Sequence, residues 1–70
     1  MAKVWVGEPP KDCQICARSI TSEFIDGKTT KGPWAMMCIH CHHECGVGLG
    51  TGKGQRYTLQ SDEEWHKVEG

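Results

Sequence analysis

Two Cys-x-x-Cys pairs constrain this chain more than any other feature. The first pair is Cys13 and Cys16, the second is Cys38 and Cys41, and 21 residues lie between the pairs. Two cysteines three positions apart on a tight turn can direct both sulfur atoms at one point, so two such turns supply the corners of a tetrahedron. The spacing is close to that of structural zinc sites. It predicts one structural Zn2+ held by these four thiolates.

Length and composition favour a fold that depends on a metal. The chain has 70 residues, nine glycines and three prolines, and a domain of this size usually needs a metal, disulfides or a partner besides its core. Five cysteines cannot all pair as disulfides within one chain. The first residues contain no apolar segment typical of a secretion signal. We therefore expect a cytoplasmic, reducing location, where metal binding is favoured over disulfides.

The charge and the hydropathy bound the possible partners. No run approaches the roughly 20 apolar residues of a spanning helix, which predicts a soluble protein without a membrane partner. The formal net charge is −1, and it falls to about −3 when four thiolates hold one Zn2+. Because a negative protein is a poor match for a phosphate backbone, nucleic acid is possible but disfavoured. We expect a monomer.

The central part of the chain predicts a β-hairpin followed by a short helix. The hairpin is expected over residues 20–31 with its turn at Asp26-Gly27, a dipeptide typical of type I′ turns. The run from Ile39 to Cys45 has no helix breaker and is followed by Gly46, which predicts one to two helical turns. Phe24 and Trp34 are the expected core residues beside the metal.

Shorter segments are expected on either side. Residues 3–6 and residues 55–60 favour strands, because β-branched and aromatic side chains suit a pleated surface. For residues 61–68 a second hairpin is favoured over a helix that would begin with the capping box of Ser61 and Glu64.

The choice of metal ligands leaves alternatives open. Cys45 lies four residues after Cys41 on the same helix face, so it is a possible substitute ligand, a buried small hydrophobe or a free thiol. His42 is the other possible substitute. Residues 38–42 also match the C-x-x-C-H pattern of haem attachment, which normally needs export and would leave the first cysteine pair without a role.

A glycine-rich loop follows the expected helix. Residues 46–54 have a glycine at every second position, but Val47 stands where a Walker A loop requires its first glycine. The loop region 46–57 is basic and displays three side chains that could contact a phosphate backbone or stack a base: Lys53, Arg56 and Tyr57. This is the basis of an alternative function, a nucleic-acid-binding zinc finger.

No catalytic residues are predicted. His66 has no evident nucleophile as a partner, and the consecutive acids at positions 62–64 are typical of a solvated segment. We therefore expect a non-enzymatic interaction module that presents aromatic side chains to a protein partner: Trp5, Trp34, Tyr57 and Trp65.

The order of these motifs resembles two known groups of proteins. The two cysteine pairs, together with Asp26-Gly27-Lys28-Thr29, Gly32–Met37 and the glycine loop, resemble a group of small tailed-phage and prophage proteins over residues 13–57. That resemblance implies a phage or prophage origin, the host cytoplasm and a host or phage protein as partner, and no particular activity. The sequence of knuckle, hairpin, second pair and helix also resembles treble-clef zinc fingers, with a zinc ribbon as the alternative. The expected fold is a small metal-stabilised α+β domain over residues 1–70, with its core at 13–57.

Overall fold

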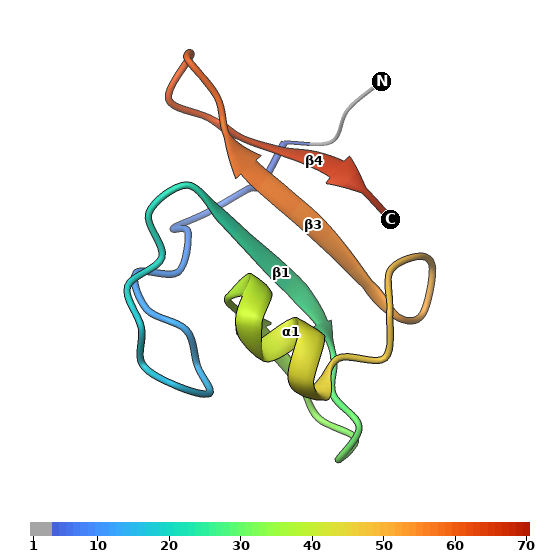
Figure 1. Cartoon of the computed structure of the whole chain (residues 1–70). Helices are drawn as coiled ribbons and strands as arrows, with labels where there is room; N and C mark the ends of the chain where they lie inside the picture. The colour runs from blue at the N-terminus through green and yellow to red at the C-terminus, as the bar shows by residue number, and fades with distance from the viewer. Residues whose placement is uncertain (1–3) are drawn as a thin grey trace.

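The computed structural model describes residues 4–70 as a four-stranded antiparallel sheet with one short helix. The strands lie in the order β2-β1-β3-β4, and α1 packs on β1 (Figure 1). No helix among these residues is long and apolar enough to cross a membrane. In chain order the elements are β1 (Glu23–Lys28), β2 (Trp34–Met37), α1 (Ile39–Cys45), β3 (Gly54–Leu59) and β4 (Trp65–Glu69).

The first hairpin turns at residues 29–33, so the predicted turn at Asp26-Gly27 was wrong. The Thr29 N–H donates to the Pro33 carbonyl at 3.0 Å, and the Gly32 N–H donates to the Thr29 carbonyl at 3.0 Å. Gly32 has a φ of 110°, which glycine adopts without a steric penalty. Asp26 and Gly27 lie inside β1 and pair with strands on both sides. The turn forms instead at the later Gly32-Pro33, where Gly32 has the positive φ and Pro33 accepts the hydrogen bond from Thr29.

Gly27 allows the backbones of two strands to approach closely and is not part of a turn. It lies opposite Gly54 of β3 in the strand register. A Cβ at Gly27 would be 3.1 Å from the Lys53 carbonyl oxygen and 3.3 Å from the Gly54 Cα. Both contacts are with backbone atoms, which cannot rotate away as a side chain can.

Strand β4 pairs with β3 on one side and with the N-terminal segment on the other. The hairpin expected at the C-terminal end is confirmed, and the capping-box helix was wrong. In its turn the Glu64 N–H donates to the Asp62 Oδ1 at 2.9 Å. Of the strand expected over residues 3–6, Val4 forms an isolated bridge with His66; Lys3 lies outside the described residues.

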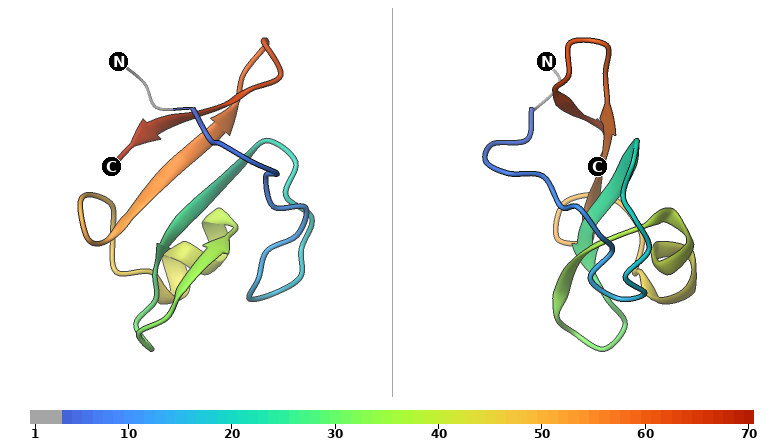
Figure 2. Two further views of the ribbon diagram at one scale, coloured as in Figure 1. Left: turned by 180° about the vertical axis from the view of Figure 1, so that it is seen from behind. Right: turned by 90° about the vertical axis from the view of Figure 1, so that its left-hand side faces the viewer.

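Side chains pack on both faces of the sheet. One face holds an aromatic cluster, in which Phe24 stacks on Tyr57 with ring centroids 5.3 Å apart. Trp5 meets both rings edge-on with centroids at 5.2 Å, and Trp65 contacts Phe24 at 5.2 Å. Figure 2 shows in its right-hand view the N-terminal segment on one side of the sheet and α1 on the other. The predicted burial of Phe24 is confirmed, since it is 0% exposed, but its predicted place beside the metal was wrong, because it packs in the aromatic cluster and not among the cysteines.

The opposite face holds a second cluster, which we call the cysteine-side core. Ile25 and Met37 lie opposite each other in β1 and β2 and are 1% and 0% exposed. They pack with three buried cysteines, and Ala35 is among the half-buried neighbours. Trp34 is 48% exposed, so its predicted place in the core was wrong. It stands at the beginning of β2, three residues before Met37, and alternation along the strand points the two side chains to opposite faces.

Helix α1 ends at Gly46, as predicted, but for a different reason. Gly46 has φ −78° and ψ 157°, an extended conformation that any residue can adopt. A Cβ at this position would overlap the carbonyl oxygen and the ring of His42. Glycine is therefore required here by space.

Candidate metal centre

The structure brings the four predicted ligand cysteines together. The sulfur atoms of Cys13, Cys16, Cys38 and Cys41 all lie within 4.8 Å of one another, and those of Cys16 and Cys38 are 3.7 Å apart. Tetrahedral zinc with Zn–S bonds of about 2.3 Å separates its sulfur ligands by roughly 3.8 Å. The four cysteines are therefore arranged to hold one metal ion.

The first pair is held by a tight knuckle. The Cys13 N–H donates to the Arg18 carbonyl at 2.8 Å, and the Ala17 N–H donates to the Cys13 carbonyl at 2.9 Å. The Ile15 N–H is 3.4 Å from the Cys13 sulfur and donates to it. Ala17 has a φ of 64°, a left-handed conformation that lets the chain turn back directly after Cys16. The knuckle thus directs two sulfur atoms at one point.

The second pair lies at the beginning of α1. Cys38 is the N-cap residue, and its sulfur accepts a hydrogen bond from the Cys41 N–H at 3.5 Å. The Cys38 carbonyl accepts the first helical hydrogen bond from the His42 N–H at 3.0 Å. The N-cap position therefore holds the Cys38 sulfur next to Cys41 at the first turn of α1.

A pairing between the knuckle and β2 brings the two pairs together. The Gln14 N–H donates to the Met36 carbonyl at 3.0 Å, and the Met36 N–H donates to the Gln14 Oε1 at 2.8 Å. Gln14 therefore continues the sheet for one residue beyond β2. Sequence reasoning missed this role, because nothing local marks a glutamine between two ligands as a strand partner.

Three of the four thiols are buried, and the pKa values of Cys13 and Cys41 are pushed apart. Cys13, Cys38 and Cys41 are 3%, 9% and 5% exposed, whereas Cys16 is exposed. Burial raises the pKa of Cys13, but hydrogen bonds from backbone groups of Cys16, Cys38 and Ile15 outweigh it and lower the pKa to about 6. Burial and hydrogen bonds with the other three thiols raise the pKa of Cys41. One thiolate therefore forms readily and opposes the next, a conflict that a bound cation relieves.

The two possible substitute ligands are engaged elsewhere. The Cys45 thiol donates to the Cys41 carbonyl oxygen at 3.2 Å, and the His42 Nε2 lies 3.1 Å from the Gly48 carbonyl oxygen. Neither belongs to the group of mutually close sulfur atoms. His42 instead ties the helix to the glycine loop.

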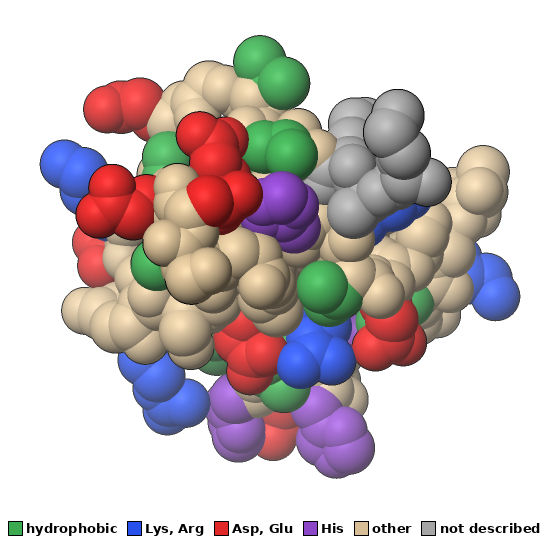
Figure 3. Space-filling view, turned by 90° about the horizontal axis from the view of Figure 1, so that it is seen from above, with side chains coloured by type: hydrophobic (Ala, Val, Ile, Leu, Met, Phe, Trp, Pro, Cys, Tyr) green, Lys and Arg blue, Asp and Glu red, His purple; other side chains and the backbone are tan. Residues whose placement is uncertain are grey.

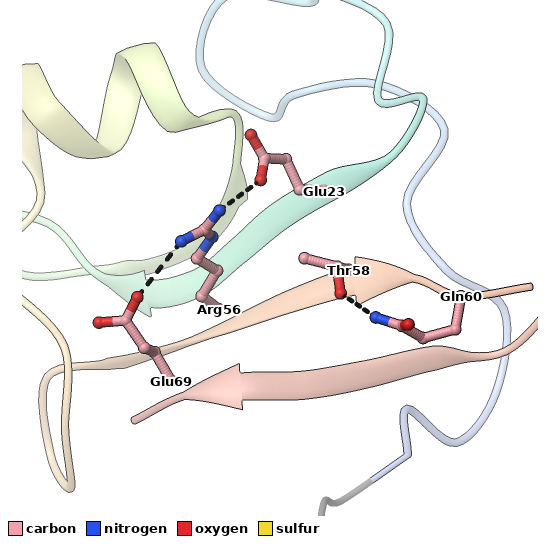
Figure 4. Close-up of polar contacts among 5 residues, drawn as sticks. All are labelled: Glu23, Arg56, Thr58, Gln60 and Glu69. Carbon is pink, nitrogen blue, oxygen red and sulfur yellow. Dashed lines mark hydrogen bonds and ion pairs between the residues drawn. The ribbon is translucent and has the colours of Figure 1, made fainter.

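The residues predicted to contact a partner differ in their availability. Arg56 binds Glu23 with its Nη2 at 2.8 Å and Glu69 with its Nη1 at 3.2 Å (Figure 4). The hydrogen bond that Arg56 donates to Glu23 raises the pKa of Arg56 above its ordinary value, against the effect of burial. Tyr57 is 3% exposed and cannot stack on a base while the aromatic cluster is intact. Trp34 and Lys53 are exposed, so both are available.

The surface charge is mixed on the side of the molecule seen from above. Figure 3 shows acidic and basic side chains interspersed there, with no continuous basic field. A phosphate backbone is bound mainly by several lysine or arginine side chains acting together. The described side chains on this face do not form such a group.

The chain was compared with protein-family models, with curated proteins and with solved structures, and none of the three comparisons gives a match.

Proposed function

We propose that this protein is a small, non-enzymatic interaction module whose fold is stabilised by one structural Zn2+. The observation on which this rests is the set of four sulfur atoms within 4.8 Å of one another. Four thiolates in a tetrahedral arrangement favour zinc or iron. Zinc is the metal of most such closed structural sites, and a closed site leaves no coordination position for water or substrate. The bound ion would supply folding free energy.

The order of elements supports a treble-clef arrangement around this ion. A knuckle provides Cys13 and Cys16, the β1–β2 hairpin follows, and Cys38 and Cys41 come from the first turn of α1. All four sulfur atoms converge on one point. Covalent attachment of Cys38 and Cys41 to haem would therefore leave the thiols of Cys13 and Cys16 without a role. A phage or prophage origin remains a prediction from the sequence.

The metal assignment is tested by native mass spectrometry of the protein folded with Zn2+. We expect one Zn2+ per chain, lost by Cys16→Ser and retained by Cys45→Ser, a matched control that removes a thiol outside the site. Because structural zinc sites contribute on the order of 10 kcal/mol, loss of one thiolate lowers affinity by orders of magnitude. Unchanged zinc binding by Cys16→Ser, or loss of zinc from Cys45→Ser, would contradict the ligand set.

The alternative of a nucleic-acid binder is tested separately. Of the three predicted contact residues, Arg56 is paired with Glu23 and Glu69 and Tyr57 is buried. We therefore expect titration of the zinc-loaded protein with single-stranded and duplex DNA and with RNA to show no salt-sensitive binding at low or moderate salt. Binding that weakens with salt, and weakens further in Lys53→Glu but not in Lys11→Glu, would restore the nucleic-acid function.

A further inference from the structure

A mostly apolar groove lies between the knuckle, β2 and α1. Its volume is about 470 Å³. Ile15 forms one wall, Pro33 and Ala35 form another, and Cys45 contributes from the helix. Ile15 is 47% exposed. The groove is next to the metal centre, since Cys41 also lines it, and the metal would hold two of its walls in place.

The outer edge of β2 has free backbone groups at Trp34, beside this groove. The N–H and carbonyl of Met36 both point outward, because both bind Gln14. Trp34 lies two residues earlier, so its N–H and carbonyl also point outward. Its neighbour in the register, Lys28, uses its own backbone groups with Lys53 and Val47. The outward groups of Trp34 therefore have no partner among residues 4–70, and they can pair with one added strand.

An added strand would place its side chains on both faces of this edge. Side chains alternate along a strand, so the residue opposite Trp34 would lie beside the exposed indole. The residues before and after it would point to the other face, toward the groove lined by Pro33 and Ala35. An aliphatic side chain suits these walls, because they are largely apolar.

The charges at this end of the molecule favour an acidic ligand. Lys31 lines the groove, and Lys28 and Lys53 lie beside each other through the hydrogen bond from the Lys28 N–H to the Lys53 carbonyl. All three side chains are exposed, and none forms an ion pair with another residue of the described chain. Glu44 is the carboxylate that lines the groove. Its Oε1 lies 3.5 Å from the Nε2 of His40, so this carboxylate has a partner on its own helix, whereas Lys31 has none among residues 4–70.

We propose that this groove and the free edge at Trp34 bind an extended acidic segment of a partner protein. The segment adds as a strand to β2, inserts one aliphatic side chain between Ile15 and Ala35, and places aspartate or glutamate near Lys31. This proposal rests on the proposed interaction function and names its surface and the chemistry of its partner.

The test is a selection of random twelve-residue peptides displayed on phage, with the zinc-loaded 70-residue chain as bait. Enriched peptides are expected to share one aliphatic residue flanked by acidic residues. Their binding, measured by fluorescence anisotropy, should weaken by about tenfold or more in Ile15→Asp, since loss of a buried anchor costs about 1.4 kcal/mol or more. The matched control Leu59→Asp, an exposed apolar residue on β3, should bind within about twofold of the unaltered protein.

A second pair of variants tests the charge preference. Lys31→Glu should weaken the binding of the acidic peptides by about fivefold or more. Lys11→Glu, which changes an exposed lysine outside the groove, should leave their binding nearly unchanged. Zinc content of each variant is measured in parallel, so that a failure of the metal centre is seen separately from a failure of the groove.

Four outcomes would overturn the groove proposal. The first is the absence of enriched peptides with zinc fully bound, and the second is enrichment of basic peptides. The third is equal binding by Ile15→Asp, which would leave the interaction function in place but move it to another surface. Sedimentation that shows a dimer broken by Ile15→Asp would also overturn it, because the occupant would then be a second copy of this chain.

Discussion

The backbone conformation of Ala17 is unfavourable for a residue that has a Cβ. Its φ of 64° lies in the left-handed region, which costs a residue with a Cβ about 1–2 kcal/mol. The position directly after the first cysteine pair requires this conformation, because the Ala17 N–H must reach the Cys13 carbonyl. The knuckle therefore stores a small strain that glycine would remove.

Ala17→Gly is accordingly expected to stabilise the zinc-loaded protein by about 0.5–1 kcal/mol, the relief of strain less the extra entropy of an unfolded glycine. Denaturant unfolding monitored by circular dichroism measures the change. The control Ala35→Gly, in a regular strand, should destabilise by a similar amount. Destabilisation by Ala17→Gly would show that the contacts of the Ala17 methyl group stabilise the protein by more than its backbone strain destabilises it.

The metal ligands were predictable at the scale of single residues, whereas the burial and the ion-pair partners of other side chains were not. Two cysteines three positions apart converge through local turn geometry alone, so Cys13 and Cys16 could be paired without knowledge of the fold. The exposure of Trp34 depended on which face of the sheet its position in β2 gives it, and no local pattern determines that face. The pairing of Arg56 with Glu23 joins residues 33 positions apart and left no signal in the sequence.

At the scale of elements, β1 and β3 approach closely where two glycines face each other. A Cβ at Gly54 would lie 3.0 Å from the Gly27 Cα and 3.3 Å from the Asp26 carbonyl oxygen. The Asp26-Gly27 dipeptide predicted a turn because its composition suits one. The glycine was instead needed for the spacing of two strands, and composition alone cannot separate these two uses.

Gly54→Ala is expected to destabilise the protein by about 1–3 kcal/mol, because the two strands must move apart to admit the methyl group. Thermal or denaturant unfolding of the zinc-loaded protein measures this change. Thr51→Ala, an exposed residue of the same loop, is the control and should change stability by less than about 0.5 kcal/mol. An unchanged stability in Gly54→Ala would mean that the strands are not in this close register.

At the scale of the whole molecule, one thin sheet separates two small clusters. The aromatic cluster lies on one face, and the cysteine-side core with the metal centre lies on the other. Neither cluster is large enough to stabilise a 70-residue chain by itself. They share β1, in which Phe24 and Ile25 are adjacent and point to opposite faces. Loss of the metal should therefore disorder both.

The most direct test of this account is the 1H–15N NMR spectrum of the zinc-loaded protein before and after removal of the metal by a strong chelator. We expect the dispersed amide signals of both clusters to collapse together, including those of Tyr57 and Trp65 on the face opposite the metal, and to return when Zn2+ is added. A metal-free protein that keeps the dispersed spectrum of the whole sheet would contradict the claim that the four cysteines hold this fold together through a metal.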